Sequence, residues 1–348
     1  ANVRSWLAAN PGARYISVSM NDNHNLCYCD NCSALMNKHG SYAGVNLTFV
    51  NRIAEAIKDE YPNVLVHTFA YFENRIVPVG IEPADNVMVE LCSIEQCFRH
   101  PLEECTAYSK ESFVDLLKGW AAISDTLAIW DYTTNYGHYA ATFPNFEVLR
   151  KNLKLFADNH VQYMFEQGNH SELRGYLISK LIWDPYMSQE ELDGYMVEFC
   201  KDYYGPGWES IIQYIQIAQE ESKDICGGIG GSPDEKFNWV QEVQINPKDS
   251  YPEELTVDMI KNYETVDWNW YKGYKEEPRI LVEGERLFQE AIAAAETEEQ
   301  KMHLDKSYTQ IQYIRSYYLG LNLECGNGSI GKIVGYFMQD HPEDFTTD

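Results

Sequence analysis

The sequence has little positive charge and no long apolar run. Lys and Arg number 27 against 53 Asp and Glu, which leaves a net charge of -26 at pH 7. A charge this negative repels nucleic-acid phosphates and anionic membrane surfaces, so it excludes nucleic acid as a partner. No apolar run approaches the roughly 18 residues of a membrane span. We therefore expect no membrane-spanning helix.

Several motifs of other reaction classes are also absent. The chain has no glycine fingerprint for a dinucleotide, no Walker loop, no serine nucleophile elbow and no HExxH helix. It begins at Ala1 without an initiator Met or a signal-peptide pattern, which predicts a processed or truncated start. The nine cysteines are an odd number spread over a large chain, unlike a small disulfide scaffold. They are free thiols of a reducing compartment or local pairs, and both alternatives stay open.

Five short apolar segments recur every 25 to 50 residues with helical patterns between them. Continuous apolar strands alternating with helices are typical of repeated βα units and a parallel sheet. The predicted strands are 15–20, 64–71, 87–92, 127–133 and 161–168. The helical patterns cover 44–60, 109–124, 146–159 and 173–183.

Five strands are too few for a closed eight-stranded barrel. We predict that residues 1–185 are the later part of a (β/α)8 barrel whose first strands lie upstream, with an open five-stranded sheet as the alternative. Residues 186–348 are predicted to be a helical domain interrupted by a Gly/Pro-rich loop at 226–251. Its helical patterns cover 190–204, 208–223, 279–295 and 298–320.

The carboxyl end of each predicted strand carries an acidic residue, and most add an amide or an aromatic ring. In a parallel α/β fold these ends form the functional face. Glycosidic cleavage needs this residue set, because one carboxylic acid protonates the leaving oxygen while a second carboxylate stabilises or attacks the anomeric carbon. The residues are Asn21 and Asp22; Tyr71 and Glu73; Glu90 and Glu95; Trp130, Asp131, Tyr132 and Asn135; Glu166 and His170.

The segments SVSMND, HTFAY, VELCSIEQC, IWDYTTN and MFEQG, followed by LISKLIWDP and YYGPG, carry a resemblance over roughly residues 1–220. They resemble a bacterial family once classed only as a domain of unknown function. That family is similar to α-glucuronidases and β-hexosaminidases, and to endo-β-N-acetylglucosaminidases acting on N-glycans. The resemblance implies a (β/α)8 glycoside hydrolase followed by a helical domain, and favours a secreted or periplasmic location. Free cysteines would equally suit the cytoplasm.

The resemblance also implies roles for three carboxylates. Asp22 lies where related barrels place an acid at a strand end, while Glu90 and Glu166 lie at later strand ends. We expect Glu166 and Glu90 to be the working carboxylates and Asp22 to orient the substrate or an acetamido group. Apolar Met164 and Phe165 favour a raised pKa for Glu166. Glu95 is an alternative to Glu90, and each of these side chains could instead bond to a loop or a neighbouring strand.

The other strand-end residues are predicted to bind substrate. Rings suit the flat faces of sugars, and amides, carboxylates and imidazoles suit their hydroxyl groups. The alternative for the rings is ordinary packing at the edge of the core. The predicted substrate-binding residues are Asn21, Tyr71, Glu95, Trp130, Asp131, Tyr132, Asn135 and His170.

Three thiols follow the first strand. Cys27, Cys29 and Cys32 have the density of a zinc site but need a fourth ligand, for which Cys92, Cys97, His24 and His100 are the candidates. Structural zinc is therefore a prediction here, and free or paired thiols are the alternative.

The sequence thus predicts a glycoside hydrolase that cleaves an amino-sugar- or uronic-acid-containing glycan by carboxylate acid/base catalysis and needs no cofactor for it. The alternatives are a non-catalytic carbohydrate-binding barrel and a zinc-stabilised structural module. A fragment lacking the early strands could be inactive by itself. The expected partner is an oligosaccharide, and the sequence makes no prediction of oligomeric state.

Overall fold

The structure is a computed structural model. It describes residues 2–105, 112–134, 136, 140–168, 171–224, 226–227, 255–262, 265, 279–318, 338–339 and 341–345. The chain forms two compact units. Unit 1 comprises residues 1–134, 147–170 and 178–187, and unit 2 comprises 135–146, 171–177 and 188–348. A single domain boundary after residue 185 stays a prediction.

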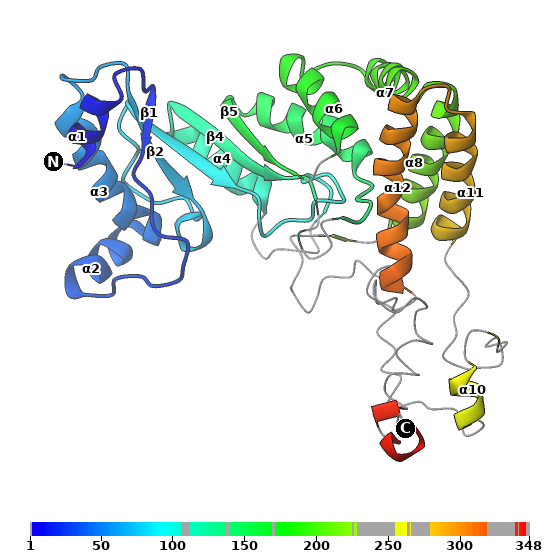
Figure 1. Ribbon diagram of the computed structural model, residues 1–348. Helices are drawn as coiled ribbons and strands as arrows, with labels where there is room; N and C mark the ends of the chain where they lie inside the picture. The colour runs from blue at the N-terminus through cyan, green and yellow to red at the C-terminus, as the bar shows by residue number, and fades with distance from the viewer. Residues whose placement is uncertain are drawn as a thin grey trace. The chain divides into compact units, whose positions relative to one another are not determined.

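Unit 1 is built on a five-stranded parallel sheet. The strands are β1 (Tyr15–Ser17), β2 (Leu65–Ala70), β3 (Val87–Cys92), β4 (Thr126–Tyr132) and β5 (Val161–Gln167). Each pairs in parallel with the next along the chain, as the blue-to-green series of arrows in Figure 1 shows. The predicted parallel sheet of a partial (β/α) barrel, followed by a helical region, is confirmed.

Five α-helices accompany the strands in the chain order of βα units: α1 (Asn2–Ala9), α2 (Asp30–His39), α3 (Tyr42–Ile57), α4 (Phe113–Ile123) and α5 (Phe146–Asp158). A short 3-10 helix, η1 (Phe72–Asn74), follows β2. Helix α4 begins after Ser112, whose hydroxyl accepts the Asp115 N–H, as an N-cap residue does. Helix α2 was not predicted, and Gly40, in the left-handed region at φ 72°, ends it.

The two faces of the sheet differ. Apolar side chains at alternate positions of the strands pack with the helices in one hydrophobic core. On β3 these are Val87, Val89 and Leu91, so Met88 and Glu90 point to the opposite face. We call the first the helix-covered face and the second the open face.

Unit 2 is helical among the residues that the structure describes. Its principal helices are α7 (Gln189–Tyr204), α8 (Trp208–Ser222), α11 (Arg279–Ala294) and α12 (Glu298–Tyr318), and α6 (Glu172–Trp183) begins in it. Shorter elements are η3 (Gly205–Gly207), α10 (Val257–Lys261) and η7 (Pro342–Phe345). Most of the predicted loop at 226–251 lies outside the described residues.

Two glycines allow the close approach of α7, α8 and α11. Gly205 has a φ of 63° and ends α7, a backbone conformation that favours glycine. At Gly207 an added Cβ would lie 2.6 Å from the Cα of Ala291 on α11, too close without a backbone shift. The YYGPG segment is therefore a packing element of unit 2.

Among the described residues, none of the helices combines the length and the apolar character that crossing a membrane requires.

Candidate functional site

A row of rings crosses the open face of the sheet in unit 1. The Tyr15 ring meets His67 at 6.3 Å between centroids, and His67 meets Phe69 at 4.7 Å. Phe69 meets Trp130 at 5.5 Å, and Trp130 meets Phe165 at 4.3 Å. Tyr15 and Phe165 remain 56% and 47% exposed. The open face is therefore aromatic and accessible in this chain.

Glu90 lies among these rings and is held by His67. The Nε2 of His67 lies 2.9 Å from the Glu90 carboxylate, and its Nδ1 lies 2.9 Å from the Ser17 hydroxyl. The His67 side chain is 6% exposed and that of Glu90 is 12% exposed. A carboxylate bonded to a buried ring nitrogen has a fixed orientation, which a working carboxylate needs.

Two further carboxylates gather with Glu90 at the carboxyl ends of the strands. Burial raises the pKa of the Cys92 thiol, and the charges of Glu90, Glu95 and Asp22 raise it further. All three carboxylates therefore act electrostatically on the same thiol. Burial raises the pKa of Tyr71, and the Asp22 carboxylate raises it further. We call Asp22, Glu90 and Glu95 the carboxylate cluster.

The loop after β2 supports this cluster. Arg75 forms an ion pair with Glu95 at 3.1 Å, with both side chains about one quarter exposed or less. Phe72 has a φ of 46°, a strained conformation for a non-glycine residue, and its ring packs at a tilt against Tyr71 with a centroid separation of 3.9 Å. Backbone strain of this kind concentrates at functional sites, so it favours a functional role for this loop.

Asp131 and Glu166 form a second carboxyl pair, on the helix-covered face. They are paired across β4 and β5, two residues beyond Ile129 and Met164, which belong to or pack against the core. Both carboxyl oxygens of Glu166 are buried without a hydrogen-bond partner among the described residues. Burial raises the pKa of both carboxyls, and the charge of Asp131 raises that of Glu166 further. Ser93 donates to Asp131, which lowers the pKa of Asp131 in part.

The remaining predicted binding residues have separate surroundings. Asn21 is exposed on the loop that carries Asp22. The indole N–H of Trp130 donates to the Gln167 side chain at 2.7 Å, and Tyr132 is buried and stacked on Phe98. Asn135 and His170 lie outside the described residues. The predicted residues thus lie in three places: on the open face, in the buried pair Asp131 and Glu166, and in the surrounding loops. Their roles stay predictions.

Three contributors were not predicted from the sequence: His67, Arg75 and Ser93. His67 had a detectable signal, because strict alternation in HTFAY places it on one face with Phe69 and Tyr71. Arg75 and Ser93 follow their strands in irregular segments, where sequence spacing gives no face.

The cysteines form two groups that could hold a metal. Cys27, Cys29 and Cys32 come together on the β1–α2 loop, as predicted, with their sulfurs all within 4.8 Å. The expected fourth ligands lie elsewhere: Cys97 and His100 belong to a second group with Cys105, also within 4.8 Å. His24 bonds instead to Glu73 at 2.9 Å.

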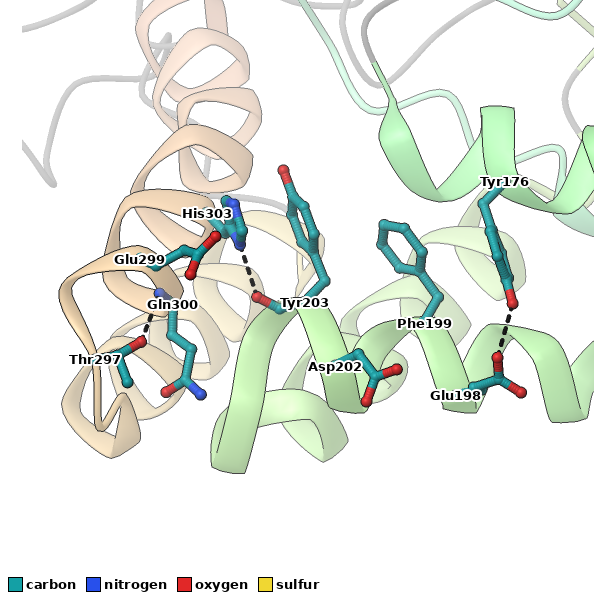
Figure 2. Close-up of a pocket in the computed structure, with 9 residues that line it drawn as sticks. All are labelled: Tyr176, Glu198, Phe199, Asp202, Tyr203, Thr297, Glu299, Gln300 and His303. Carbon is teal, nitrogen blue, oxygen red and sulfur yellow. Dashed lines mark hydrogen bonds between the residues drawn. The ribbon is translucent and has the colours of Figure 1, made fainter.

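Unit 2 contains a separate cavity of about 470 Å³. Figure 2 shows its rings projecting from α6, α7 and α12. Tyr203 stacks on His303 at 3.7 Å and on Phe199 at 4.9 Å, and Tyr176 donates to Glu198 at 2.9 Å. The lining residues are Tyr176, Glu198, Phe199, Asp202, Tyr203, Thr297, Glu299, Gln300 and His303.

A parallel half-barrel with acidic strand ends is a fold class that hosts many enzymes. The chain belongs to the DUF4838 family, a domain of unknown function whose model matches residues 1–216. The predicted membership of a family defined as a domain of unknown function is therefore confirmed, and its kinship to named glycosidases stays a prediction.

The chain is also similar to a solved structure, that of a GH138 enzyme targeting pectin rhamnogalacturonan II. The identity is 12% and the TM-score 0.41, with 86% of this chain and 44% of that chain covered. The match thus spans less than half the length of that enzyme. A comparison with curated protein sequences gave no match.

Proposed function

We propose that the protein is a glycoside hydrolase acting on a glycan that contains amino sugars or uronic acids. The observation that carries the proposal is Glu90, which His67 holds at 2.9 Å among the aromatic rings of the open face, with Asp22 and Glu95 on loops that follow β1 and β3. Several carboxylates beside aromatic rings in one accessible region match the needs of glycosidic cleavage.

Glu90 is the proposed general acid and base. The bond from His67 fixes one carboxyl oxygen, while the side chain keeps a small exposed surface on the open face. As an acid, Glu90 would give its proton to the glycosidic oxygen as the bond to the anomeric carbon breaks. His67 is then a positioning residue, because it acts through Glu90.

Asp22 and Glu95 are the proposed second carboxylates. One of them would stabilise the positive charge that develops at the anomeric carbon, or activate the attacking water. Arg75, paired with Glu95, adds a cation that the carboxylate of a uronic acid could meet. Tyr71 and Trp130 are the proposed platforms for sugar rings, since each is half-buried at a strand end.

Glu166, predicted as a working carboxylate, receives a different role in this proposal. Its position on the helix-covered face, with both oxygens buried and Asp131 opposite it in the register, favours a carboxyl that burial keeps neutral over one that contacts substrate. If Glu166 is catalytic instead, Glu166→Gln should lose activity while the pH dependence of the free energy of unfolding stays as in wild type.

The experiment is a panel of glycans incubated with the intact protein, with released products identified by mass. Cleavage of an amino-sugar or uronic-acid linkage supports the proposal, and Glu90→Gln should slow it by about 100-fold or more. The matched control is Glu104→Gln, because Glu104 forms an exposed ion pair with Lys151. Absence of cleavage across the panel, or unchanged turnover in Glu90→Gln, would reject it.

The alternative of carbohydrate binding without catalysis has its own observation, the cavity of unit 2. Rings backed by carboxylates and an amide suit a sugar, whose C–H faces and hydroxyls need both. In this alternative Tyr203→Ala weakens glycan binding, whereas Glu90→Gln leaves it unchanged. Calorimetric titration of both variants separates the two functions.

A further inference from the structure

The Cys27, Cys29 and Cys32 thiols have the separation that a single zinc ion requires. Their sulfurs all lie within 4.8 Å of one another. Three thiolates at about 2.3 Å from a tetrahedral zinc are roughly 3.8 Å apart, so small rotations of the side chains close the site. A disulfide uses only two sulfurs, whereas a metal uses all three.

The start of helix α2 favours thiolates at this place. Cys29 is the N-cap of α2 and Cys32 lies in its first turn, where the positive end of the helix dipole stabilises negative charge.

We propose that Cys27, Cys29 and Cys32 bind one zinc ion as thiolates, with water in the fourth position. Binding releases three protons, one from each thiol, and leaves the cluster with a net charge of -1. Zinc suits the site because sulfur-rich tetrahedral ligands select it over the hard cations.

The ion would fix the loop that carries Asn21 and Asp22. Within residues 19–28 the backbone–backbone bonds are local, from Asn23 to Asn21 and from Leu26 to His24, whereas Val18 still donates to the His67 carbonyl on β2. The Cys27 N–H donates to the Tyr42 hydroxyl on α3 at 3.0 Å. A zinc ion would add a firm link between the end of this loop and the start of α2. The consequence for Asp22 rests on the proposed function, whereas metal binding does not.

A second group carries the same inference independently. Cys97, His100 and Cys105 follow β3, and their ligand atoms lie within 4.8 Å of one another. The Sγ of Cys97 lies 3.4 Å from the Nδ1 of His100. Cys97 is buried and the other two are half-buried, which is typical of a structural rather than a catalytic metal. We propose zinc here too, on the loop that begins with Glu95.

The test is metal analysis of the intact chain, purified with a reductant in buffer containing zinc. Wild type should hold about two zinc ions per chain. Cys27→Ser/Cys29→Ser removes two exposed thiols and should lose about one equivalent, and Cys105→Ser should lose the other. Cys200→Ala, a buried thiol of α7 outside both groups, is the control and should lose none.

Cobalt gives a readout independent of folding yield. Apo protein titrated with Co²⁺ should develop the sulfur-to-cobalt charge-transfer absorption and the visible bands of tetrahedral cobalt, reduced in each cluster variant. Wild type with zinc well below one equivalent overturns both sites. A cluster variant that keeps the full complement of zinc and the full cobalt absorption overturns its own site. Neither result depends on glycan cleavage, so failure of the metal sites and failure of the proposed function are distinguishable.

Discussion

The buried carboxyl pair makes a sharp prediction for the variant Glu166→Gln. Both oxygens of Glu166 are buried without a partner among the described residues, and Asp131 lies opposite it in the register. A buried polar group without a partner costs about 1–3 kcal/mol. The amide of Gln carries no charge, so it avoids both the burial of a charge and the repulsion from Asp131. We therefore expect Glu166→Gln to raise the free energy of unfolding by about 1–3 kcal/mol at pH 8.

The gain should depend on pH in a definite direction. The pKa of Glu166 is raised in the folded protein, so the folded state holds its proton at pH values where the unfolded state has lost it. The stability of wild type therefore falls as pH rises above the unfolded value of about 4.3, by about 1.4 kcal/mol for each pH unit until the raised folded pKa is reached. Below pH 4 both states are protonated, and the variant should differ little from wild type.

The assay is urea unfolding of the intact chain between pH 4 and pH 8.5. Glu104→Gln is again the control, since an exposed ion pair contributes about 0–1 kcal/mol and should add little pH dependence. A Glu166→Gln protein that is less stable than wild type at pH 8, or whose difference from wild type is the same at all pH values, would refute the buried-pair interpretation.

Three further predictions follow from packing and orientation. Gly207→Ala should cost about 1–3 kcal/mol in urea unfolding, because its Cβ would meet Ala291, whereas Gly194→Ala, with nothing near its Cβ, should be neutral or stabilising. Trp130→Ala should weaken glycan binding in calorimetry by tenfold or more, about 1.4 kcal/mol, and a larger loss of stability than of affinity would assign the ring to packing. His67→Gln should lower kcat and leave KM nearly unchanged, because His67 orients Glu90 without touching substrate; a change confined to KM would contradict this positioning role.

The strands could be predicted because they are apolar and bounded by turns, but their faces could not. The segment VQYMFEQ has little period-two alternation, and the register shifts between Leu127 and Ala128 of β4. One residue of shift moves a side chain to the opposite face. The sequence therefore predicts that Glu166 lies at a strand end. Its location on the helix-covered face follows only from the pairing register of β4 and β5 in the structure.

The partners of the site residues depend on long-range contacts. His67 and Glu90 are 23 residues apart, and Arg75 and Glu95 are 20 apart, so neither pair has a local pattern. Helix α2 was missed because its first turn contains the cysteine motif, which predicts a loop. The thiol cluster itself could be predicted, since a spacing of two and three residues keeps the sulfurs near one another in most loop conformations.

The most direct measurement is a crystal structure of the intact protein with a bound glycan product. The account predicts a sugar ring on the open face, resting against Trp130 or Tyr71, with the Glu90 carboxylate within hydrogen-bonding distance of the oxygen released by cleavage. A product bound only in the cavity of unit 2, or on the open face with neither oxygen of Glu90 near the sugar, would contradict it.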